Sequence, residues 1–328
     1  MLNRAHFGDC RDIMRTLAAE GVRVQCCVTS PPYYSLRDYG HPGQIGLEQT
    51  PAEYVAALVE VFEGVRELLA SNGVLWLNLG DSYASGGRAT RDTDEKLSAR
   101  GMDTRPADGA RPKNLLGIPW RVAFALQEAG WYVRQDIIWH KPNPMPESVG
   151  DRCTKAHEYL FLMSKSERYF WDATAMQERS AAANAHDHTG GFIAGQVPGA
   201  RPQSGTRKSG NKERKPASVP WEGFTRNRRS VWTVSSEPYS GAHSATFPRA
   251  LIEPCILAGS RPGDVVFDPF LGSGTTAQVA QELGRQWVGC EINREYEALI
   301  QARVAQLALP LCEVAREEQI EQPCEMLF

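Results

Sequence analysis

The sequence has no uninterrupted apolar run of the ~18 residues that a membrane-spanning helix requires. Its first ten residues, MLNRAHFGDC, also lack the charged and then apolar order of a secretory signal peptide. We therefore expect a soluble, cytoplasmic protein with no membrane partner. The 328 residues, of which 42% are hydrophobic, suffice for one large core or for a core with a smaller lobe.

Zinc-binding cysteine patterns are also lacking. The eight cysteines include no CxxC pair and no cluster with histidine at metal-ligand spacing. Several of them stand inside apolar runs such as QCCVTS and WVGCE, which is typical of reduced, buried thiols. We expect neither disulfides nor a metal.

An overall basic charge is lacking as well, since the formal net charge is -3. This excludes a uniformly basic nucleic-acid binder, but the charge is unevenly distributed along the chain. Residues 200–230 contain nine Lys or Arg against two Glu, and residues 311–328 contain five Glu against one Arg. Either run could be a solvated surface, so neither assigns a function by itself.

Apolar periodicity predicts alternating strands and helices. Strands are expected at 22–29, 73–79, 132–139, 158–163, 265–268 and 286–290, and helices at 51–69, 118–128 and 275–283. The proline-rich link between the third and fourth strands indicates an antiparallel pair. The sequence thus predicts an α/β, Rossmann-like fold, whose mostly parallel sheet has an antiparallel strand pair, helices on both faces and an inserted region.

The segment 265–291 has the order of a nucleotide site: strand, glycine-rich turn, helix, strand and acid. The turn reads GSGTT and lacks the third glycine of a dinucleotide fingerprint. Asp268 would repel a pyrophosphate but suits an ammonium group, such as that of a methionine moiety. Glu291, at the end of the next strand, can accept hydrogen bonds from ribose hydroxyls.

A second motif, Thr29-Ser30-Pro31-Pro32-Tyr33-Tyr34, ends the first long strand. The two prolines hold the backbone so that the Ser30 hydroxyl and the Pro31 carbonyl can face one amino group. Tyr33 offers an aromatic face for a planar base. A strand-ending turn would also explain this motif, just as a tight turn would explain the glycines at 272–274.

Taken together, TSPPYY and FDPFLGSGTT closely resemble the two motifs of the S-adenosylmethionine-dependent DNA amino-methyltransferases, which modify cytosine N4 or adenine N6. The catalytic motif precedes the cofactor motif, as in the permuted, beta-type arrangement of that family. The resemblance reaches to about residue 304. It implies S-adenosyl-L-methionine as cofactor and double-stranded DNA as partner, with the target base flipped out of the helix.

The resemblance also assigns site residues. The catalytic group would be Ser30, Pro31, Pro32 and Tyr33. The cofactor group would be Asp9, Thr246, Phe247, Asp268, Phe270, Gly272, Ser273, Gly274, Thr275 and Glu291. The DNA-binding group would be Arg226, Arg228 and Arg229, of which each single arginine is better assigned to a phosphate than to a base.

Domain boundaries follow from the same comparison. We expect the catalytic half at 1–179, a target-recognition insert at 180–235, the cofactor-binding half at 236–310 and an acidic tail at 311–328. A homodimer and a cognate restriction endonuclease are further partners consistent with a prokaryotic or phage enzyme of this family. His140 and Lys141 are interpreted as structural or DNA-facing, and Trp76, Trp131 and Trp139 as core residues.

The target atom and the function class have alternatives. Serine at the first position of SPPY favours cytosine N4, with adenine N6 as the alternative. A nicotinamide-dependent oxidoreductase, a catalytically silent DNA-binding protein, and an RNA or protein-glutamine methyltransferase also remain open at this point. Methyl transfer to DNA is favoured because it accounts for both motifs and for the basic insert.

Overall fold

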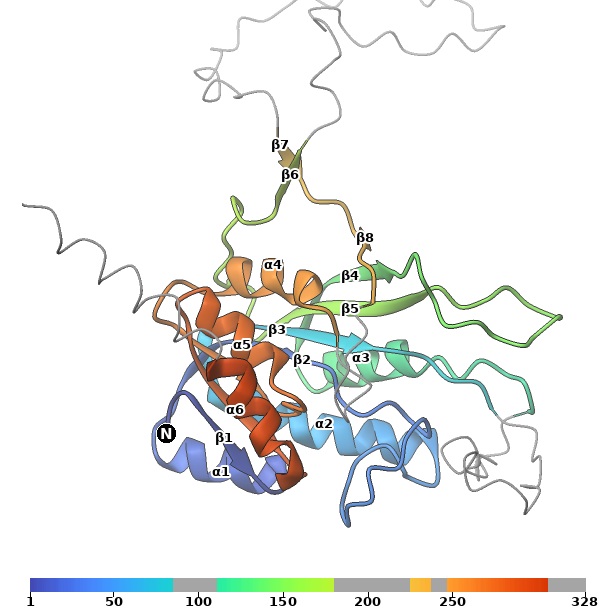
Figure 1. Cartoon of the computed structure of the whole chain (residues 1–328), viewed down its shortest axis with the longest axis horizontal. Coiled ribbons are helices and arrows are strands. Elements are labelled where there is room, and N and C mark those ends of the chain that lie inside the picture. Colours follow the sequence, from blue (N-terminus) through green and yellow to red (C-terminus); the bar gives the residue numbers. More distant parts are fainter. Residues whose placement is uncertain (85–110, 180–224, 237–246, 306–328) are drawn as a thin grey trace, which may run out of the picture. The chain divides into compact units, whose positions relative to one another are not determined.

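The computed structural model describes residues 1–84, 111–179, 225–236 and 247–305 (Figure 1). It divides into two units. The larger unit comprises Met1–Ala175 and Arg229–Phe328, and the smaller one comprises Met176–Arg228. Most of the predicted segment 180–235 and all of the predicted segment 311–328 lie outside the described residues.

An eight-stranded sheet forms the centre of the larger unit, in the order β1-β10-β9-β2-β3-β5-β4-β8. All neighbouring pairs in it are parallel except those of β5, which runs antiparallel to both β3 and β4. The strands are β1 Arg4–Phe7, β2 Val24–Thr29, β3 Leu69–Leu79, β4 Tyr132–His140, β5 His157–Ser164, β8 Val231–Thr233, β9 Val265–Asp268 and β10 Gln286–Glu291.

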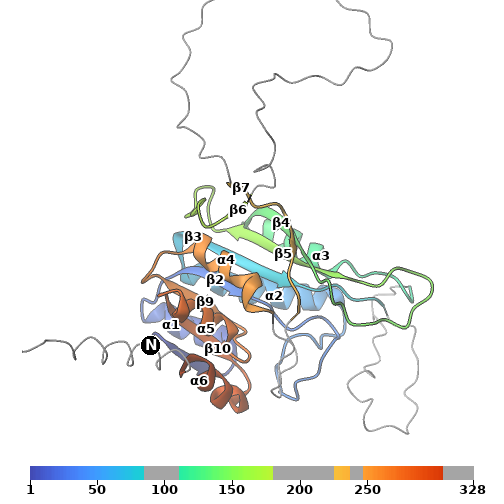
Figure 2. The same ribbon diagram turned by 45° about the horizontal axis from the view of Figure 1, so that its top comes forward.

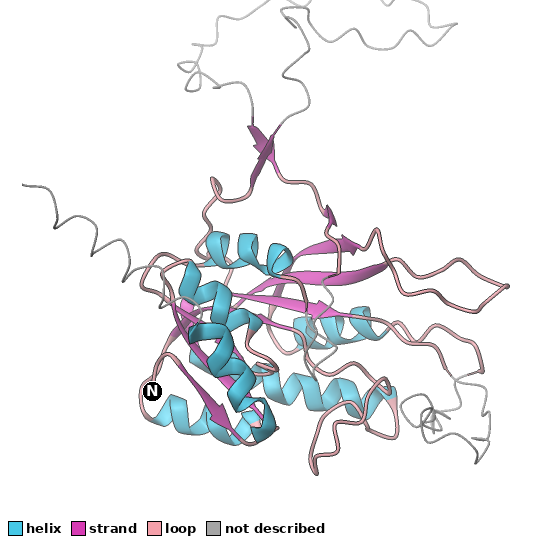
Figure 3. Cartoon of the chain, viewed as in Figure 1, coloured by secondary structure: helices cyan, strands magenta, loops and turns pink. Residues whose placement is uncertain are grey.

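Helices cover both faces of this sheet (Figures 2 and 3). Helices α1, α2 and α3 pack along one face, and α4, α5 and α6 lie on the other. Their bounds are α1 Cys10–Ala19, α2 Pro51–Leu68, α3 Ile118–Glu128, α4 Arg249–Gly259, α5 Thr275–Glu282 and α6 Glu297–Ala305, with a short 3-10 turn at Arg294–Tyr296. None of the helices in the described ranges is long and apolar enough to cross a membrane.

Helix α2 begins where the sequence chemistry requires. Thr50 accepts a hydrogen bond from the backbone N–H of Glu53, whose carboxylate accepts one from the N–H of Thr50, and Pro51 follows at the first helical position. This capping box satisfies backbone donors that would otherwise lack partners. The apolar face predicted for this helix is buried, and it holds α2 against the sheet.

The order of the strands reverses between β2 and β9. The chain passes from β2 through α2 to β3 on one side, and from β9 through α5 to β10 on the other. In open parallel sheets, the carboxyl ends of strands at such a reversal leave a crevice that binds ligands. Both motifs overlap the ends of strands that flank this point, which are Thr29 in β2 and Asp268 in β9.

The predicted fold class is confirmed, including the antiparallel pair of β4 and β5. Trp76, Trp131 and Trp139 are buried as expected. The periodicity did not indicate β1, α1, α4, β8, α6 or the strands of the smaller unit. Of these, β1 and β8 are only four and three residues long, and α4 is interrupted by a proline at position 254.

The smaller unit contains a two-stranded antiparallel ribbon of β6, Gln177–Arg179, and β7, Thr225–Asn227. Within it, Arg226 forms an ion pair of 2.9 Å with Glu178. Residues 180–224 of the predicted target-recognition insert lie outside the described residues, whereas β8, which falls within the same predicted insert, belongs to the larger unit.

Cysteine burial agrees with the expectation of reduced thiols. The six cysteines in the described ranges are free, and only Cys153 among them is exposed. Burial raises the pKa of the Cys27 and Cys290 thiols well above the usual value, because a thiolate there would lose its hydration. These two buried thiols are therefore unreactive packing groups.

We predict that Gly259→Ala destabilises the fold although alanine favours helices. A Cβ at Gly259 would lie 2.7 Å from a Val74 methyl and 2.8 Å from Cys26 Sγ, so α4 would have to move off the sheet. The free energy of unfolding should fall by about 1–3 kcal/mol in urea titrations. Gly150→Ala is the matched control, since a Cβ there meets no atom within 4 Å. Equal stability of the two variants would contradict the close approach.

Candidate functional site

A cavity of about 670 Å³ lies at the carboxyl ends of the strands that flank the reversal point. Its walls include Ser30 after β2, Asn78 near the end of β3, Asp268 at the end of β9 and Glu291 at the end of β10. Its volume is in the range of small-molecule and cofactor sites. The fold therefore brings the two sequence motifs to one cavity.

A hydrogen bond from helix α2 fixes the position of the SPPYY segment. The Pro32 carbonyl accepts a hydrogen bond of 2.8 Å from the Tyr54 hydroxyl, on α2. The Pro31 carbonyl, in contrast, accepts no hydrogen bond from any described residue. Ser30 and Pro31 both line the cavity, so a rigid turn presents a hydroxyl and a carbonyl acceptor to it.

Tyr33 occupies a more constrained position than the sequence indicates. Its hydroxyl lies 2.5 Å from Glu158 Oε2, 3.1 Å from Asn78 Oδ1 and 3.4 Å from Ser30 Oγ. Burial, followed by the neighbouring Glu158, raises the pKa of Tyr33 well above its usual value, so the hydroxyl keeps its proton. A Cβ at Gly80 would lie 2.5 Å from the ring, which is why glycine is required there.

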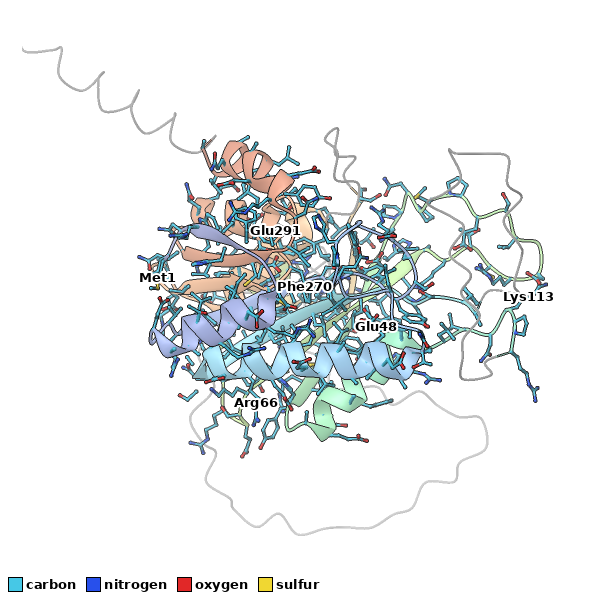
Figure 4. The ribbon with its side chains drawn as sticks, turned by 90° about the horizontal axis from the view of Figure 1, so that it is seen from below. Met1, Glu48, Arg66, Lys113, Phe270 and Glu291 are labelled. Carbon is cyan, nitrogen blue, oxygen red and sulfur yellow. The ribbon has the colours of Figure 1, made fainter. Side chains whose placement is uncertain are left out.

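The cofactor motif forms a tight turn between β9 and α5. Gly272 and Gly274 have φ of 55° and 90°, which favour glycine because other side chains are strained there. The Leu271 N–H donates to the Cys290 carbonyl at 2.8 Å, and a Cβ at Gly289 would clash with the Leu271 side chain. The turn is thereby pressed against β10, with Phe270 and Glu291 beside each other at the cavity (Figure 4).

Glu291 is already held by the backbone of the turn. Its carboxylate accepts hydrogen bonds from Gly272 N at 2.7 Å and from Asn293 N at 2.8 Å. Burial raises its pKa despite these bonds. Each carboxylate oxygen keeps a lone pair, so the residue can still accept hydrogen bonds from a ribose diol, as the sequence leads us to expect.

Asp9 lines the same cavity from the start of α1. It caps the helix by accepting from Arg11 N, and its two oxygens also face the Arg11 guanidinium, at 3.0 and 2.6 Å. These hydrogen bonds lower the pKa of Asp9 and keep it charged. Phe247, on the segment before α4, also lines the cavity, whereas Thr246 lies outside the described residues.

One buried hydroxyl of the cavity wall, that of Ser273, is available to bind a polar cofactor. Ser273 Oγ is buried in the turn and has no hydrogen-bond partner among the described residues. A buried hydroxyl without a partner costs about 1–3 kcal/mol, so a bound ligand that pairs with it recovers that cost. Ser273 and Thr275 line the cavity, and Gly274 shapes the turn between them.

Asp268 serves a structural purpose that the sequence does not indicate. Its carboxylate, 1% exposed, accepts hydrogen bonds from Thr29 Oγ1 at 2.6 Å, Thr276 Oγ1 at 2.6 Å and Phe270 N at 3.0 Å. It thus joins β2, α5 and the turn after β9. Burial nonetheless raises its pKa to about 6. Its expected contact with a ligand ammonium stays a prediction.

The residues that line the cavity outside both motifs include Asn78, Trp139, Lys141 and Glu158. Lys141 lines the cavity and forms an ion pair with Glu158. The interpretation of Lys141 as a structural or DNA-facing residue is compatible with this position and stays a prediction. Trp139 on β4 pairs with Glu158 on β5, and this pairing brings Lys141, which follows β4, close to Glu158. In the sequence, the available signal for this cluster was the predicted antiparallel strand pair, with the charged residue Glu158 at the start of an apolar strand.

The three predicted DNA-binding arginines do not line the cavity. Arg226 and Arg228 belong to the smaller unit and Arg229 begins the second part of the larger one. Arg226 forms an ion pair with Glu178, and the backbone N–H of Arg228 donates to the Met176 carbonyl at 2.8 Å. Their contact with DNA remains a prediction.

Comparison with known proteins identifies the family. Residues 24–302 match the DNA methylase family of the N6/N4 type. The chain is 47% identical over 299 residues to the Type II methyltransferase M.SmaI of Serratia marcescens, with 90% of this chain and 89% of that one covered. This chain belongs to the N4/N6 DNA amino-methyltransferases. The family predicted from the two motifs is confirmed, and with it S-adenosyl-L-methionine as the cofactor.

Further relatives of this methylase agree. M.XycI of Xanthomonas campestris pv. cyanopsidis, also a Type II methyltransferase, is 46% identical over 299 residues, covering 90% of this chain and 86% of that one. Among solved structures, the PvuII DNA methyltransferase (cytosine-N4-specific) superposes with a TM-score of 0.57 at 21% identity, over 92% of this chain and 85% of that one. The M1.HpyAVI–SAM complex gives 0.51 at 18% identity, over 92% and 98%. The oxidoreductase alternative is thereby excluded.

We predict that the stability of Asp268→Asn depends on pH differently from that of the unchanged methylase. The folded-state pKa of about 6 lies above the ordinary 3.8, so the folded protein binds the extra proton between these values. The stability contributed by Asp268 is therefore present below about pH 4 and is lost as pH rises through about 6. Asparagine removes this loss, so between pH 4 and 7 the variant should gain up to about 3 kcal/mol relative to the unchanged chain.

Urea titrations across this pH range measure the difference, and a difference that stays constant with pH would contradict the prediction. Titration of the same variant with S-adenosylmethionine in a calorimeter tests the ammonium contact separately. A weaker Kd at pH 7 supports that contact. An unchanged Kd assigns Asp268 only to the junction between the two motifs.

Proposed function

We propose that this methylase transfers the methyl group of S-adenosylmethionine to the N4 amino group of cytosine in double-stranded DNA. The observation that carries the proposal is the single cavity lined by both motifs: Ser30 and Pro31 on one side, and the turn from Phe270 to Thr275 on the other. A methyl donor and an acceptor amine that share one cavity can react directly.

The residues of this chain act by position and charge. The cofactor, when bound, supplies a methyl group activated by a positive sulfur. An exocyclic amine is a weak nucleophile, because its lone pair is delocalised into the ring. Ser30 Oγ and the Pro31 carbonyl accept hydrogen bonds from the amine, which favours a pyramidal nitrogen with its lone pair free. The Tyr33 ring, anchored through its hydroxyl, supports the base.

Cytosine is the preferred target because the catalytic motif begins with serine, and because the structural relative from PvuII is described as cytosine-N4-specific. Adenine N6 is the alternative, since both bases present the same amino group to the same acceptors. An amine paired inside a duplex cannot enter the cavity, so the base must turn out of the helix.

DNA contacts are assigned to the insert at 180–235 and to Arg226, Arg228 and Arg229, which we propose bind backbone phosphates. A cognate restriction endonuclease is a further proposed partner, supported by Type II methyltransferases among the relatives. A homodimer stays a proposal, for which sedimentation of the purified chain at several concentrations is the measurement.

We expect N4-methylcytosine as the product. Purified protein is incubated with methyl-labelled S-adenosylmethionine and mixed-sequence duplex DNA, and the labelled nucleoside is identified by mass spectrometry. Detection of N6-methyladenine instead would support the same site and would change the proposed target base to adenine. Cofactor binding without any labelled nucleoside would overturn the proposed function in favour of an RNA, a protein or a catalytically silent role, and RNA and protein fractions are assayed alongside.

Ser30→Ala should lower the single-turnover rate by about 100- to 1,000-fold, because one of two preorganised acceptors is removed. The Kd for S-adenosylmethionine should change less than about twofold, since Ser30 belongs to the amine side of the cavity. Ser71→Ala serves as the control, because Ser71 is exposed and lies near the start of β3, whereas the cavity is at the carboxyl end of that strand. A variant at Ser30 that keeps its full rate would remove Ser30 from the mechanism.

A further inference from the structure

The cavity contains an ion pair that neither motif explains. Lys141 Nζ binds Glu158 Oε1, and the two side chains are only 21% and 15% exposed. Partial burial of two charges is costly, and their attraction repays the cost only in part. The Lys141 ammonium also lies 4.2 Å from the centre of the Trp139 ring, so a second contact holds it in place. The pair is therefore a fixed feature of the site.

The other oxygen of Glu158 faces the catalytic motif. Glu158 Oε2 accepts a hydrogen bond of 2.5 Å from the Tyr33 hydroxyl. Ser30 Oγ lies 3.4 Å from Tyr33 Oη, with geometry that allows Ser30 to donate. Three polar groups thus form a chain from the amine acceptor Ser30, through Tyr33, to a carboxylate. The 3.4 Å link is long, as hydrogen bonds of catalytic sites often are before substrate binds.

Proton counting gives this chain a direction. Each hydroxyl has one proton, and that of Tyr33 goes to Glu158, its nearer acceptor, rather than to Asn78 at 3.1 Å. Asn78 is itself fixed, since its Nδ2 donates to the Tyr159 carbonyl at 3.1 Å. Ser30 can then donate to Tyr33 and use its lone pairs to accept from the amine.

Tyr33 is suited to pass a proton on and not to store one. Burial and the neighbouring carboxylate raise its pKa well above the usual value, so the phenolate is strongly disfavoured. The ring packs closely against Gly80, where an added Cβ would lie 2.5 Å from a ring atom, so the residue is held tightly in place. Transfer along the chain therefore has to be concerted, with each oxygen gaining one proton as it loses another.

We propose that Glu158 is the final acceptor of the proton that the target amine loses on methylation, reached through Ser30 and Tyr33. This inference rests on the proposed function and concerns the same cavity. As the nitrogen–carbon bond forms, the carbon–sulfur bond breaks and its electron pair stays on sulfur. The amine, now positively charged, gives a proton to Ser30 Oγ, Ser30 gives its own to Tyr33, and Tyr33 gives its own to Glu158.

The surroundings of Glu158 suit this task. Lys141 keeps Oε1 engaged, which leaves Oε2 for the proton. Lys155 and His157, which precede and begin β5, also interact electrostatically with Glu158. The side chain is partly exposed, so the proton can pass to solvent before the next turnover. No change of charge is left on Ser30 or Tyr33.

The test compares three variants in single-turnover methylation of DNA: Glu158→Gln, Tyr33→Phe and the double variant. Glutamine can still accept a hydrogen bond from Tyr33, but it cannot take up the proton, so the rate should fall about 100-fold. Tyr33→Phe keeps the ring and breaks the chain, with a similar loss. The double variant should be within about threefold of the slower single variant, because both changes remove one function.

A solvent isotope effect separates proton transfer from mere positioning. The single-turnover rate of the unchanged methylase should fall in heavy water, because three protons move together, and Glu158→Gln should lose most of that fall. Kd values for S-adenosylmethionine and DNA, measured by fluorescence, should stay within about twofold. Glu282→Gln, which disrupts a comparable ion pair with Arg249 outside the cavity, is the matched control.

Two results would overturn the inference: a Glu158→Gln rate within about twofold of the unchanged methylase, or losses that multiply in the double variant. A solvent isotope effect that is retained in full in Glu158→Gln would likewise assign Glu158 to positioning alone. If the unchanged protein methylates no DNA, the proposed function itself fails, and that result is seen before any variant is compared.

Discussion

The hydrogen bond between Thr29 Oγ1 and Asp268 Oδ1 joins the two strands at which the sheet reverses its order. The catalytic motif continues directly after Thr29, and the cofactor turn continues directly after Asp268. A carboxylate buried this deeply must have its lone pairs satisfied, and it is, by two threonine hydroxyls and one backbone N–H. The distance between amine acceptors and cofactor turn is consequently determined by one side chain and its partners.

The charge of the cavity matches the change of charge in the reaction. Asp9, Asp268, Glu158 and Glu291 all line it, and the three cations among the described lining residues, Arg11, Arg37 and Lys141, neutralise only part of this acidity. The cofactor of this family has a positive sulfur before transfer and an uncharged one afterwards. An acidic wall therefore attracts the reactant more strongly than the product, which favours exchange after each turnover.

Much of this organisation can be predicted from sequence, because periodicity and turn chemistry are local. Helix α3 and strand β9 have the predicted ends, and both motifs end strands as expected. The hydrogen bonds from Thr29 to Asp268 and from Tyr33 to Glu158 could not be predicted, since they join residues 239 and 125 positions apart. The strand β1 is only four residues long, and its pairing is determined by β10 and not by its own pattern.

The pairing of β1 with β10 brings Arg4 opposite Val288, and Trp287 N donates to Asn3 Oδ1 across 284 residues of chain. During synthesis on the ribosome, the first strand must wait for nearly all of the chain before its neighbour exists. The strand that leads into the SPPYY motif is complete much earlier than β9 and β10, which lead into the glycine-rich turn and Glu291. Such long-range pairing implies slow folding with a high contact order, and a cavity whose walls stay incomplete until both parts of the chain have met.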